Sequence, residues 1–275
     1  MNRLVLLAHH DADAEVKPYV RRHLAALRPL ARRIELVSNS PLPAAEVASL
    51  GPLVDGVRLR PNTGFDFGMW KDAFAAADLR GVDALVLTNS SVIGPLTPLA
   101  PIFERMVGAG WDFWGMTESG QFRLHLQTYF LVFTPRVFGS LAFRSFFESV
   151  LPYRNKTNVI HAYELGLTAF LRESGFRGGA AFPVEDLPQR PLADLVVRGR
   201  LRSRGYERRK NPTLYFPDRL LAAGMPFVKT ELLRAHARRA RRLGLTAAVD
   251  TYLAVPDDAR PGRDAPAAGR AVGKA

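Results

Sequence analysis

The chain has 275 residues, of which 47% are apolar, 23% charged and 10% aromatic. This composition excludes wholesale disorder, collagen and coiled coil, and the length suits one large or two small globular domains. The absence of cysteine excludes disulfides, a cysteine nucleophile and thiolate metal sites. No apolar run approaches the ~18–20 residues of a membrane span, and the N-terminal run 4–8 is broken at His9. We therefore expect a cytoplasmic protein without a signal peptide.

The charge balance favours partners that carry phosphate. Basic residues outnumber acidic residues by 38 to 26, which gives a formal net charge of +12. An excess of this size attracts nucleotides, nucleic acids and anionic lipids, and it does not choose among them.

The first half of the chain alternates short apolar runs with segments of helical periodicity. The apolar runs predict strands at residues 3–8, 34–37, 57–59 and 84–87, the last of them apolar throughout, as in a strand buried on both faces. Helical spacing predicts a helix over 16–32, and residues 63–77 indicate a Gly-containing loop that passes into a helix. This alternation predicts an α/β domain with a mostly parallel sheet.

The second half is richer in aromatic and then in basic residues. Its patterns predict a core strand at 129–133 and helices at 138–150, 158–174 and 220–243. We expect an α/β domain over residues 1–197 and a basic, partly helical extension over 198–255 that packs on it. Beyond Pro256 the composition falls to Ala, Pro, Gly, Asp and Arg, so residues 256–275 are predicted to be a disordered tail.

Polar residues follow three of the predicted strands. They are His9-His10-Asp11, the segment 60–68 and Asn89-Ser90-Ser91. Ligands bind at the carboxyl ends of strands in open α/β sheets, so these positions are candidates for a site. Taken singly, histidines at such positions are more often loop residues than ligands, and a loop rich in glycine and asparagine is more often a tight turn than a phosphate-binding loop. The motifs HExxH, GxSxG, GxGxxG and the Walker P-loop are all absent.

The order of these segments resembles the rhamnan synthesis protein F family, glycosyltransferase-like proteins that build rhamnose-containing bacterial surface polysaccharides. The resemblance covers roughly residues 4–233. The matching stretches, in chain order, are LAHHD (7–11), VSNS (37–40), RPNTGFDFGMWKDAF (60–74), LVLTNSSVIGPL (85–96), DFWGMTES (112–119), HLQTYFLVF (125–133), VIHAYELGLT (159–168), GF (175–176), NPT (211–213) and GMPFVKTELL (224–233).

The resemblance implies a GT-A-like glycosyltransferase fold, with a mostly parallel central sheet flanked by helices. It also implies a donor that is a nucleotide-diphosphate sugar, bound over the first strands, where Asn62 and Gly64 form an Asn-x-Gly loop. The expected donor-binding residues are His10, Asp11, Asn62, Gly64, Asp66, Asn89, Ser90 and Ser91.

One position departs from the family pattern. Many GT-A enzymes carry an Asp-x-Asp metal motif after the fourth strand, and the family usually shows Asn-Asp-Ser there, whereas this chain has Ser90 in place of the Asp. A hydroxyl is a poor ligand for Mg²⁺ or Mn²⁺, which prefer carboxylates. A metal cofactor is therefore in question, and a catalytically inactive module that still binds glycan or nucleotide sugar becomes the alternative function.

Transfer with inversion, which the resemblance implies, needs a carboxylate that takes the proton of the acceptor hydroxyl. Glu164 stands where such enzymes place this base, although a solvated glutamate on a helix face explains it equally well. Asp66 either binds sugar hydroxyls or caps a helix, and Lys229 either meets a phosphate or is an exposed lysine at a helix start. The expected acceptor and sugar pocket consists of Asp112, Trp114, His125 and Gln127, for which core positions are the competing explanation.

Two basic segments, Arg198–Lys210 and Arg234–Arg242, are either solvated faces or electrostatic contacts with an anionic membrane. Membrane contact suits the family, whose acceptors are expected on polyprenyl diphosphate lipids at the cytoplasmic leaflet. Together these features predict a transferase that moves a deoxyhexose, such as rhamnose, onto a growing surface glycan. A basic protein that binds nucleic acid is the other alternative, and the small number of aromatic residues among the basic ones speaks against it.

Overall fold

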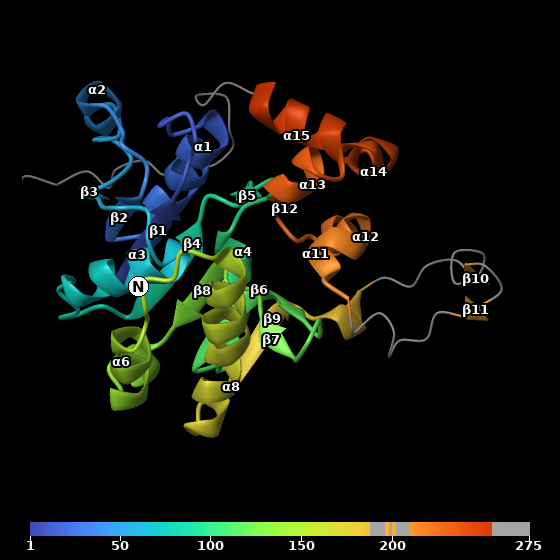
Figure 1. Cartoon of the computed structure of the whole chain (residues 1–275). Helices are drawn as coiled ribbons and strands as arrows, with labels where there is room; N and C mark the ends of the chain where they lie inside the picture. The colour runs from blue at the N-terminus through green and yellow to red at the C-terminus, as the bar shows by residue number, and fades with distance from the viewer. Residues whose placement is uncertain (188–195, 198–199, 202–209, 255–275) are drawn as a thin grey trace, which may run out of the picture.

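A computed structural model describes residues 1–187, 196–197, 200–201 and 210–254. Its centre is an eight-stranded sheet in which the first four strands in space are parallel and β8 is antiparallel to both neighbours (Figure 1). The strands, in spatial order, are β3 (Gly56–Leu59), β2 (Arg33–Ser38), β1 (Arg3–His9), β4 (Ala84–Asn89), β8 (Phe130–Phe133), β6 (Phe113–Ser119) and β7 (His125–Leu126), with β9 (Gly178–Phe182) paired to β6. The predicted fold class, a GT-A-like α/β fold with a mostly parallel central sheet, is confirmed.

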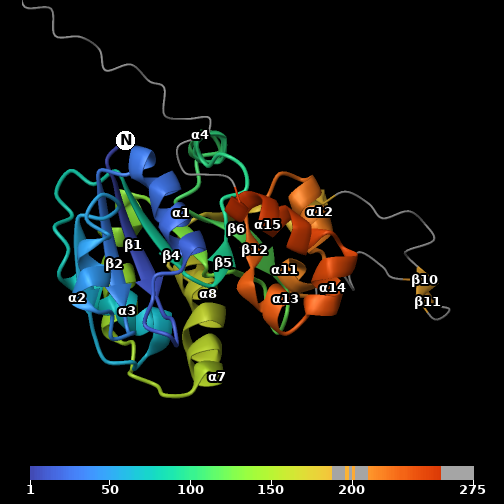
Figure 2. The same ribbon diagram turned by 90° about the horizontal axis from the view of Figure 1, so that it is seen from above.

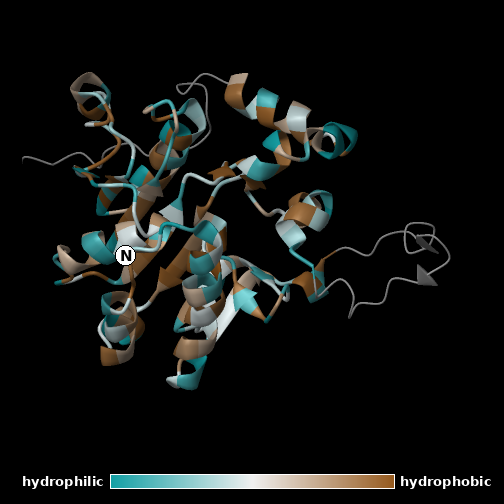
Figure 3. Cartoon of the chain, viewed as in Figure 1, coloured by the Kyte–Doolittle hydropathy of each residue, from teal (hydrophilic) through white to brown (hydrophobic). Residues whose placement is uncertain are grey.

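Helices cover both faces of this sheet. Those that flank it are α1 (Pro18–Leu27), α2 (Ala44–Ala48), α3 (Phe65–Ala75), α4 (Ala100–Gly108), α5 (Pro135–Phe138), α6 (Leu141–Glu148), α7 (Lys156–Val159) and α8 (Leu165–Glu173). Side chains alternate along β1, so Val5 and Leu7 pack with α1 and α4, whereas Leu4 and Leu6 pack with α3 and α6. The apolar run of β1 is therefore buried on both faces. Figure 3 colours much of the central sheet brown, as hydrophobic.

Several predicted helices are divided in the structure. The segment 158–174 becomes α7, a π-helical turn η2 (Ile160–Glu164) and α8. The segment 138–150 begins its main helix only at Leu141, because the Ser140 hydroxyl accepts the N–H of Phe143 and caps the helix there. The segment 16–32 ends its α-helix at Leu27 and continues as a short 3₁₀ turn.

The predicted helical region 220–243 also differs, because Gly224 and Pro226 interrupt it and a short strand follows them. The elements of the C-terminal part are α11 (Pro212–Tyr215), α12 (Pro217–Ala222), β12 (Val228–Lys229), α13 (Thr230–Arg234), α14 (Ala237–Arg242) and α15 (Leu245–Ala254). Two further short elements, β10 (Val196–Val197) and β11 (Arg200–Leu201), pair with each other. The predicted tail and most of the basic segment Arg198–Lys210 lie outside the described residues.

The C-terminal helices are joined to the sheet domain by three kinds of contact. Strand β12 pairs antiparallel with β5 (Val92–Ile93), which directly follows the end of β4. Leu232, Leu245 and other buried apolar residues pack around Ile93. Arg22 of α1 donates hydrogen bonds to the carbonyls of Tyr252 and Leu253 in the last turn of α15, where a cation also meets the negative end of the helix dipole. Figure 2 shows these helices gathered beyond β5.

No helix within the described ranges combines the length and the apolar character that crossing a bilayer requires.

A buried histidine makes the stability of this fold depend on pH. The ring of His23 packs against Phe130 and Phe227, and its Nε2 has no hydrogen-bond partner among the described residues. Burial lowers the pKa of His23 from 6.5 to about 3. As the pH falls below 6.5, His23 becomes protonated in the unfolded chain but stays neutral in the folded chain. The free energy of unfolding therefore decreases toward pH 3.

We predict that His23→Leu removes this contribution, which amounts to roughly 1 kcal/mol per pH unit within that window. Urea unfolding of the wild type and the variant between pH 7 and 4 measures the difference between the two slopes. His236→Leu, at an exposed position of the C-terminal region, is the matched control and should follow the wild type. Parallel curves for wild type and His23→Leu would contradict the prediction.

Candidate functional site

The carboxyl ends of β1, β2 and β4 bring three polar segments together. The register pairs Ala8 with both Val37 and Asn89, so the residues that follow lie at one level of the sheet. His10 connects all three segments: its backbone N–H donates to Ser90 Oγ at 3.2 Å, and its Nδ1 lies 2.7 Å from Asn39 Oδ1. The loops after β1 and β4 therefore lie together in the structure, and the loop after β2 joins them.

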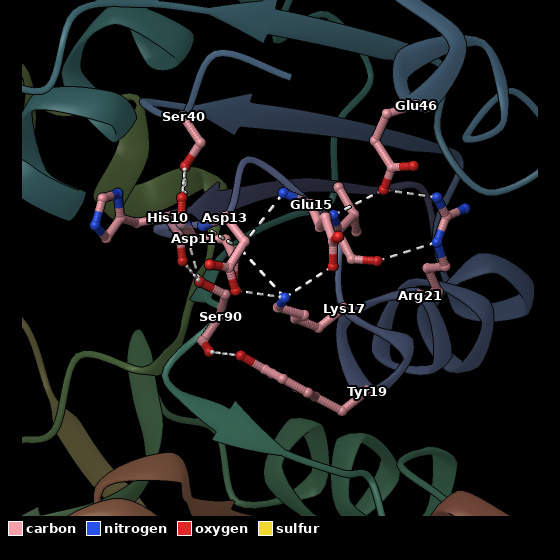
Figure 4. Close-up of polar contacts among 11 residues, drawn as sticks. His10, Asp11, Asp13, Glu15, Lys17, Tyr19, Arg21, Ser40, Glu46 and Ser90 are labelled. Carbon is pink, nitrogen blue, oxygen red and sulfur yellow. Dashed lines mark hydrogen bonds and ion pairs between the residues drawn. The ribbon is translucent and has the colours of Figure 1, made fainter. Parts of the chain in front are cut away.

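Asp11 holds its own loop rather than facing outward. Its carboxylate accepts the backbone N–H groups of Asp13 and Glu15, and its own N–H donates to Ser40 Oγ at 2.7 Å (Figure 4). Lys17 lies beside this carboxylate at 3.6 Å. Asp11 is buried, and these hydrogen bonds fix the path of the chain after β1.

His9 is buried beneath the same edge. Its Nδ1 lies 2.9 Å from Ser38 Oγ, and its Nε2 has no partner among the described residues. Burial lowers the pKa of His9 to about 4, so the ring is neutral near pH 7. It therefore supplies no positive charge to a ligand at neutral pH.

The Asn-x-Gly loop is tied to this edge through its first residue. Asn62 Oδ1 accepts a hydrogen bond of 2.8 Å from Asn39 Nδ2, so Asn39 bridges His10 and Asn62. Gly64 is the N-cap residue of α3 and has a φ of +73°, a conformation that favours glycine. A Cβ at this position would lie 3.1 Å from the Cα of Gly68, so the loop is closely packed against the first turn of the helix.

Asp66 does not cap the helix, which corrects one of its two expected roles. The N-cap is Gly64, and Asp66 points from the first turn of α3 to the end of β4, where its Oδ2 accepts a 2.7 Å hydrogen bond from Asn89 Nδ2. Asn89 Oδ1 in turn accepts from the N–H and the hydroxyl of Ser91. Burial raises the pKa of the Asp66 carboxyl, and the charge of Lys229 and the Asn89 hydrogen bond oppose this effect.

Glu164 and Lys229 complete what we call the edge cluster, which consists of Asp66, Asn89, Ser91, Glu164 and Lys229. Glu164 is included because its charge acts on both Asp66 and Lys229. Glu164 ends the π-helical turn, a local geometry often found at functional sites, and its Oε1 is 3.5 Å from the N–H of Thr128. Lys229 Nζ donates to Ser91 Oγ at 3.1 Å. The edge cluster therefore contains two carboxylates and one ammonium group, supplied by α3, η2 and β12.

Gln127 lies deeper, in a buried hydrogen-bond network. Its Oε1 accepts from the hydroxyl of Thr117 at 2.8 Å, and its Nε2 donates to Asn211 Oδ1 and Thr213 Oγ1. The network attaches the start of α11 to the sheet. Its observed contacts are those of a satisfied polar group in the core.

The other residues of the expected acceptor pocket lie away from the edge cluster. Asp112 precedes β6 and lies near the amino ends of the parallel strands, opposite their carboxyl ends. Its carboxylate pairs with Arg136 there and accepts the N–H of Arg177. Trp114 is 3% exposed and packs on Phe103, so it belongs to the core. The expected acceptor pocket is therefore wrong for Asp112 and Trp114, because neither side chain lies at the edge cluster.

His125 is also buried. It lies in β7, and its Nδ1 is bonded to the carbonyl of Arg123 at 2.8 Å, a contact within its own loop. Neither this contact nor its position brings it into the edge cluster.

The residues at the end of β4 do not fit a divalent cation. Mg²⁺ and Mn²⁺ prefer carboxylate oxygens, whereas this segment offers one amide and two hydroxyls. The Ser90 hydroxyl already accepts the N–H of His10, and Asp66 is bonded to Asn89. Within the part of the chain that the structure describes, no three His, Asp or Glu side chains gather as a metal site. We derive no step through a metal.

These observations define an α/β protein with a GT-A-like sheet and a polar site at the carboxyl edge of its parallel strands. Comparison with known families identifies it further. The model of the family described as rhamnan synthesis protein F matches residues 34–250, and the chain belongs to this family.

Two curated relatives are also similar to the chain. The virulence protein VirA of Vibrio anguillarum is 27% identical over 190 residues, which are 64% of this chain and 61% of the relative. The uncharacterized protein y4gN of Sinorhizobium fredii is 28% identical over 134 residues, which are 46% of this chain and 35% of the relative. The chain thus spans about three fifths of the first relative and about a third of the second.

Similar solved structures include two transferases. A putative nucleotide-diphospho-sugar transferase from Desulfovibrio desulfuricans has a TM-score of 0.40 at 17% identity, over 66% of this chain and 80% of that chain. The inositol-1-phosphate CTP transferase from T. maritima has a TM-score of 0.42 at 12% identity, over 66% and 85%.

The close packing of the Asn-x-Gly loop gives a testable prediction. We expect Gly64→Ala to destabilise the fold by about 1 kcal/mol more than Gly110→Ala, because both glycines have positive φ but only Gly64 lacks room for a Cβ. Urea denaturation of the two variants measures the free energies of unfolding. Equal losses would show that the contact with Gly68 carries no strain.

Proposed function

We propose that the chain is a glycosyltransferase that moves a deoxyhexose, with rhamnose the expected sugar, from a nucleotide diphosphate to a growing bacterial surface polysaccharide. Membership of the rhamnan synthesis protein F family supports a transferase of the nucleotide-sugar type in glycan synthesis. The observation that carries the proposal is the edge cluster, in which carboxylates and a cation meet at the carboxyl ends of parallel strands.

In the proposed reaction the nucleotide-diphosphate sugar lies over the ends of β1, β2 and β4. His10, Asn62, Gly64 and the end of β4 surround it. The edge offers hydrogen-bonding groups of both kinds for base, ribose and sugar hydroxyls. Asp11 contributes by holding the loop that carries His10.

We propose that Glu164 is the general base. Its carboxylate takes the proton of the acceptor hydroxyl while that oxygen forms a bond to the anomeric carbon. The bond from the anomeric carbon to the phosphate oxygen breaks, and the electron pair leaves with the nucleoside diphosphate. Attack from the face opposite the leaving group inverts the anomeric centre. The only hydrogen bond to the Glu164 carboxylate within the described residues is the long one from the Thr128 N–H, so the carboxylate is available for this step.

We predict that Glu164→Gln lowers turnover by ~10² or more and leaves donor binding nearly unchanged, because the amide keeps the shape of the side chain but cannot take a proton. Thermal shift with nucleotide sugars measures binding, and release of the nucleoside diphosphate measures turnover. Glu173→Gln, on an exposed glutamate at the end of α8, is the matched control. Equal turnover in wild type and Glu164→Gln would remove Glu164 from the mechanism.

A second candidate function is a module that binds nucleotide sugar or glycan and catalyses nothing. Ser90, in place of the family's usual Asp, favours it. A nucleotide sugar that raises the melting temperature by binding the folded state, with no release of diphosphate in the presence of any acceptor, would identify this function.

We further propose that the acceptor is a glycan on a polyprenyl diphosphate lipid, met at the cytoplasmic face of an anionic membrane. Helix α14 is coloured as hydrophilic in Figure 3. This helix and the end of α13 support the proposal, because Arg234, Arg238, Arg241 and Arg242 are exposed.

We expect co-sedimentation with vesicles that contain anionic lipid, weakening as the salt concentration rises, since exposed charges are screened. Replacing Arg238, Arg241 and Arg242 together by Gln should weaken the association. Equal binding to neutral vesicles would contradict an electrostatic contact.

A further inference from the structure

Lys229 reaches the edge cluster from a distant part of the sequence and is held there from two sides. In the β12–β5 pair, Lys229 lies opposite Val92, and the next residue, Thr230, donates both its N–H and its hydroxyl to the carbonyl of Ser91. The Nζ then donates to Ser91 Oγ and lies 4.6 Å from the centre of the Tyr129 ring. Backbone pairing thus fixes the position from which the ammonium group extends.

The ammonium group is partly desolvated and lacks a close ion pair. Burial lowers the pKa of Lys229, whereas the charges of Glu164 and Asp66 raise it. No carboxylate of the described residues approaches its Nζ within 4.0 Å. Keeping a cation away from water without such a partner is costly, so an anion that reached this site would be bound strongly.

The ammonium group also has unused hydrogen-bonding capacity. A lysine ammonium carries three N–H donors, and one of them is directed at Ser91 Oγ. Asn89, Ser90 and Ser91 beside it are neutral, because Ser90 occupies the position where the family usually shows an Asp. A phosphate oxygen that approached the end of β4 would therefore meet a positive charge with free donors and no carboxylate from that segment.

We propose that Lys229 binds the diphosphate of the donor and neutralises the leaving group, in the place of a divalent cation. When the bond between the anomeric carbon and the phosphate oxygen breaks, the electron pair stays on that oxygen, and Lys229 donates a hydrogen bond to it without losing its proton. This inference rests on the proposed function. It makes the C-terminal segment part of the active site and the site independent of metal.

Isothermal titration calorimetry with dTDP, GDP and UDP, in EDTA and in Mg²⁺ or Mn²⁺, tests the inference. We expect the wild type to bind one of the three in EDTA, with less than about threefold change in affinity on addition of metal. Lys229→Met should weaken that binding at least tenfold, a loss of about 1.4 kcal/mol, and Lys229→Arg should restore most of it. Binding of the corresponding nucleoside, which has no phosphate, should not change.

Two controls keep the outcome specific. Arg241→Met removes one positive charge from an exposed position of α14, so it measures the effect of net charge alone and should bind as the wild type does. Lys229→Gln replaces Lys229→Met if the latter does not fold by circular dichroism, with the same expected loss. Wild-type binding that needs metal, or Lys229 variants that bind as tightly as wild type, would overturn the inference and leave the proposed function standing. Failure of the wild type to bind any nucleoside diphosphate or nucleotide sugar would overturn both.

Discussion

The parallel pairing of β1 with β2 and β4 is the constraint on which the rest of the structure depends. Because Ala8 is in register with Val37 and Asn89, the three strands end together, and every polar residue that follows them is delivered to one edge. Alternate residues of β1 pack in two separate apolar clusters, so a shift of one residue would exchange these two sets of contacts. The site is thus a consequence of how the core packs.

A second constraint places the C-terminal part of the chain on the same edge. Strand β5 begins directly after Ser91, so a strand that pairs with it must pass the end of β4. The apolar cluster around Ile93 and the hydrogen bonds of Arg22 to α15 hold this arrangement. Lys229 therefore takes its position from packing contacts more than a hundred residues away in sequence, and it adds a positive charge to an edge whose carboxylates, Glu164 and Asp66, act on it electrostatically.

Much of the fold could be predicted from the sequence because its strands are short, unbroken apolar runs. The predicted strand 84–87 is β4 (Ala84–Asn89), and 129–133 contains β8 (Phe130–Phe133). The ends of helices are harder to predict, because apolar periodicity does not reveal breaks such as the π-helical turn before Leu165. The long helix expected over 220–243 ignored Gly224 and Pro226, which stop a helix in this context.

The site was predictable where chain order alone decides the geometry. The segments containing His10 and Asn89 were singled out because each follows a predicted strand, and they lie together because those strands are parallel and adjacent. Asn39, which bridges His10 and Asn62, was missed, although its position directly after the second strand was a usable signal. Lys229 could not be placed, because only the pairing of β12 with β5 brings it close.

The opposite error arose among the aromatic residues. Trp114 was expected at the acceptor pocket for its flat ring, but the same size makes it a core residue beside Phe103. Asp112 was also among the expected pocket residues, and it precedes β6. The direction of that strand, which sequence does not show, carries Asp112 to the amino ends of the parallel strands, where Arg136 pairs with it.

We propose that a nucleotide-diphosphate sugar binds at the carboxyl edge of the parallel strands. Hydrogen–deuterium exchange of the full chain, with and without the sugar nucleotide that gives the largest thermal shift, tests it most directly. We expect slower exchange in peptides that cover residues 8–11, 60–66, 88–91 and 226–230, and unchanged exchange in α14 and around Asp112. Protection confined to α14, or none at the carboxyl edge at saturating ligand, would contradict it.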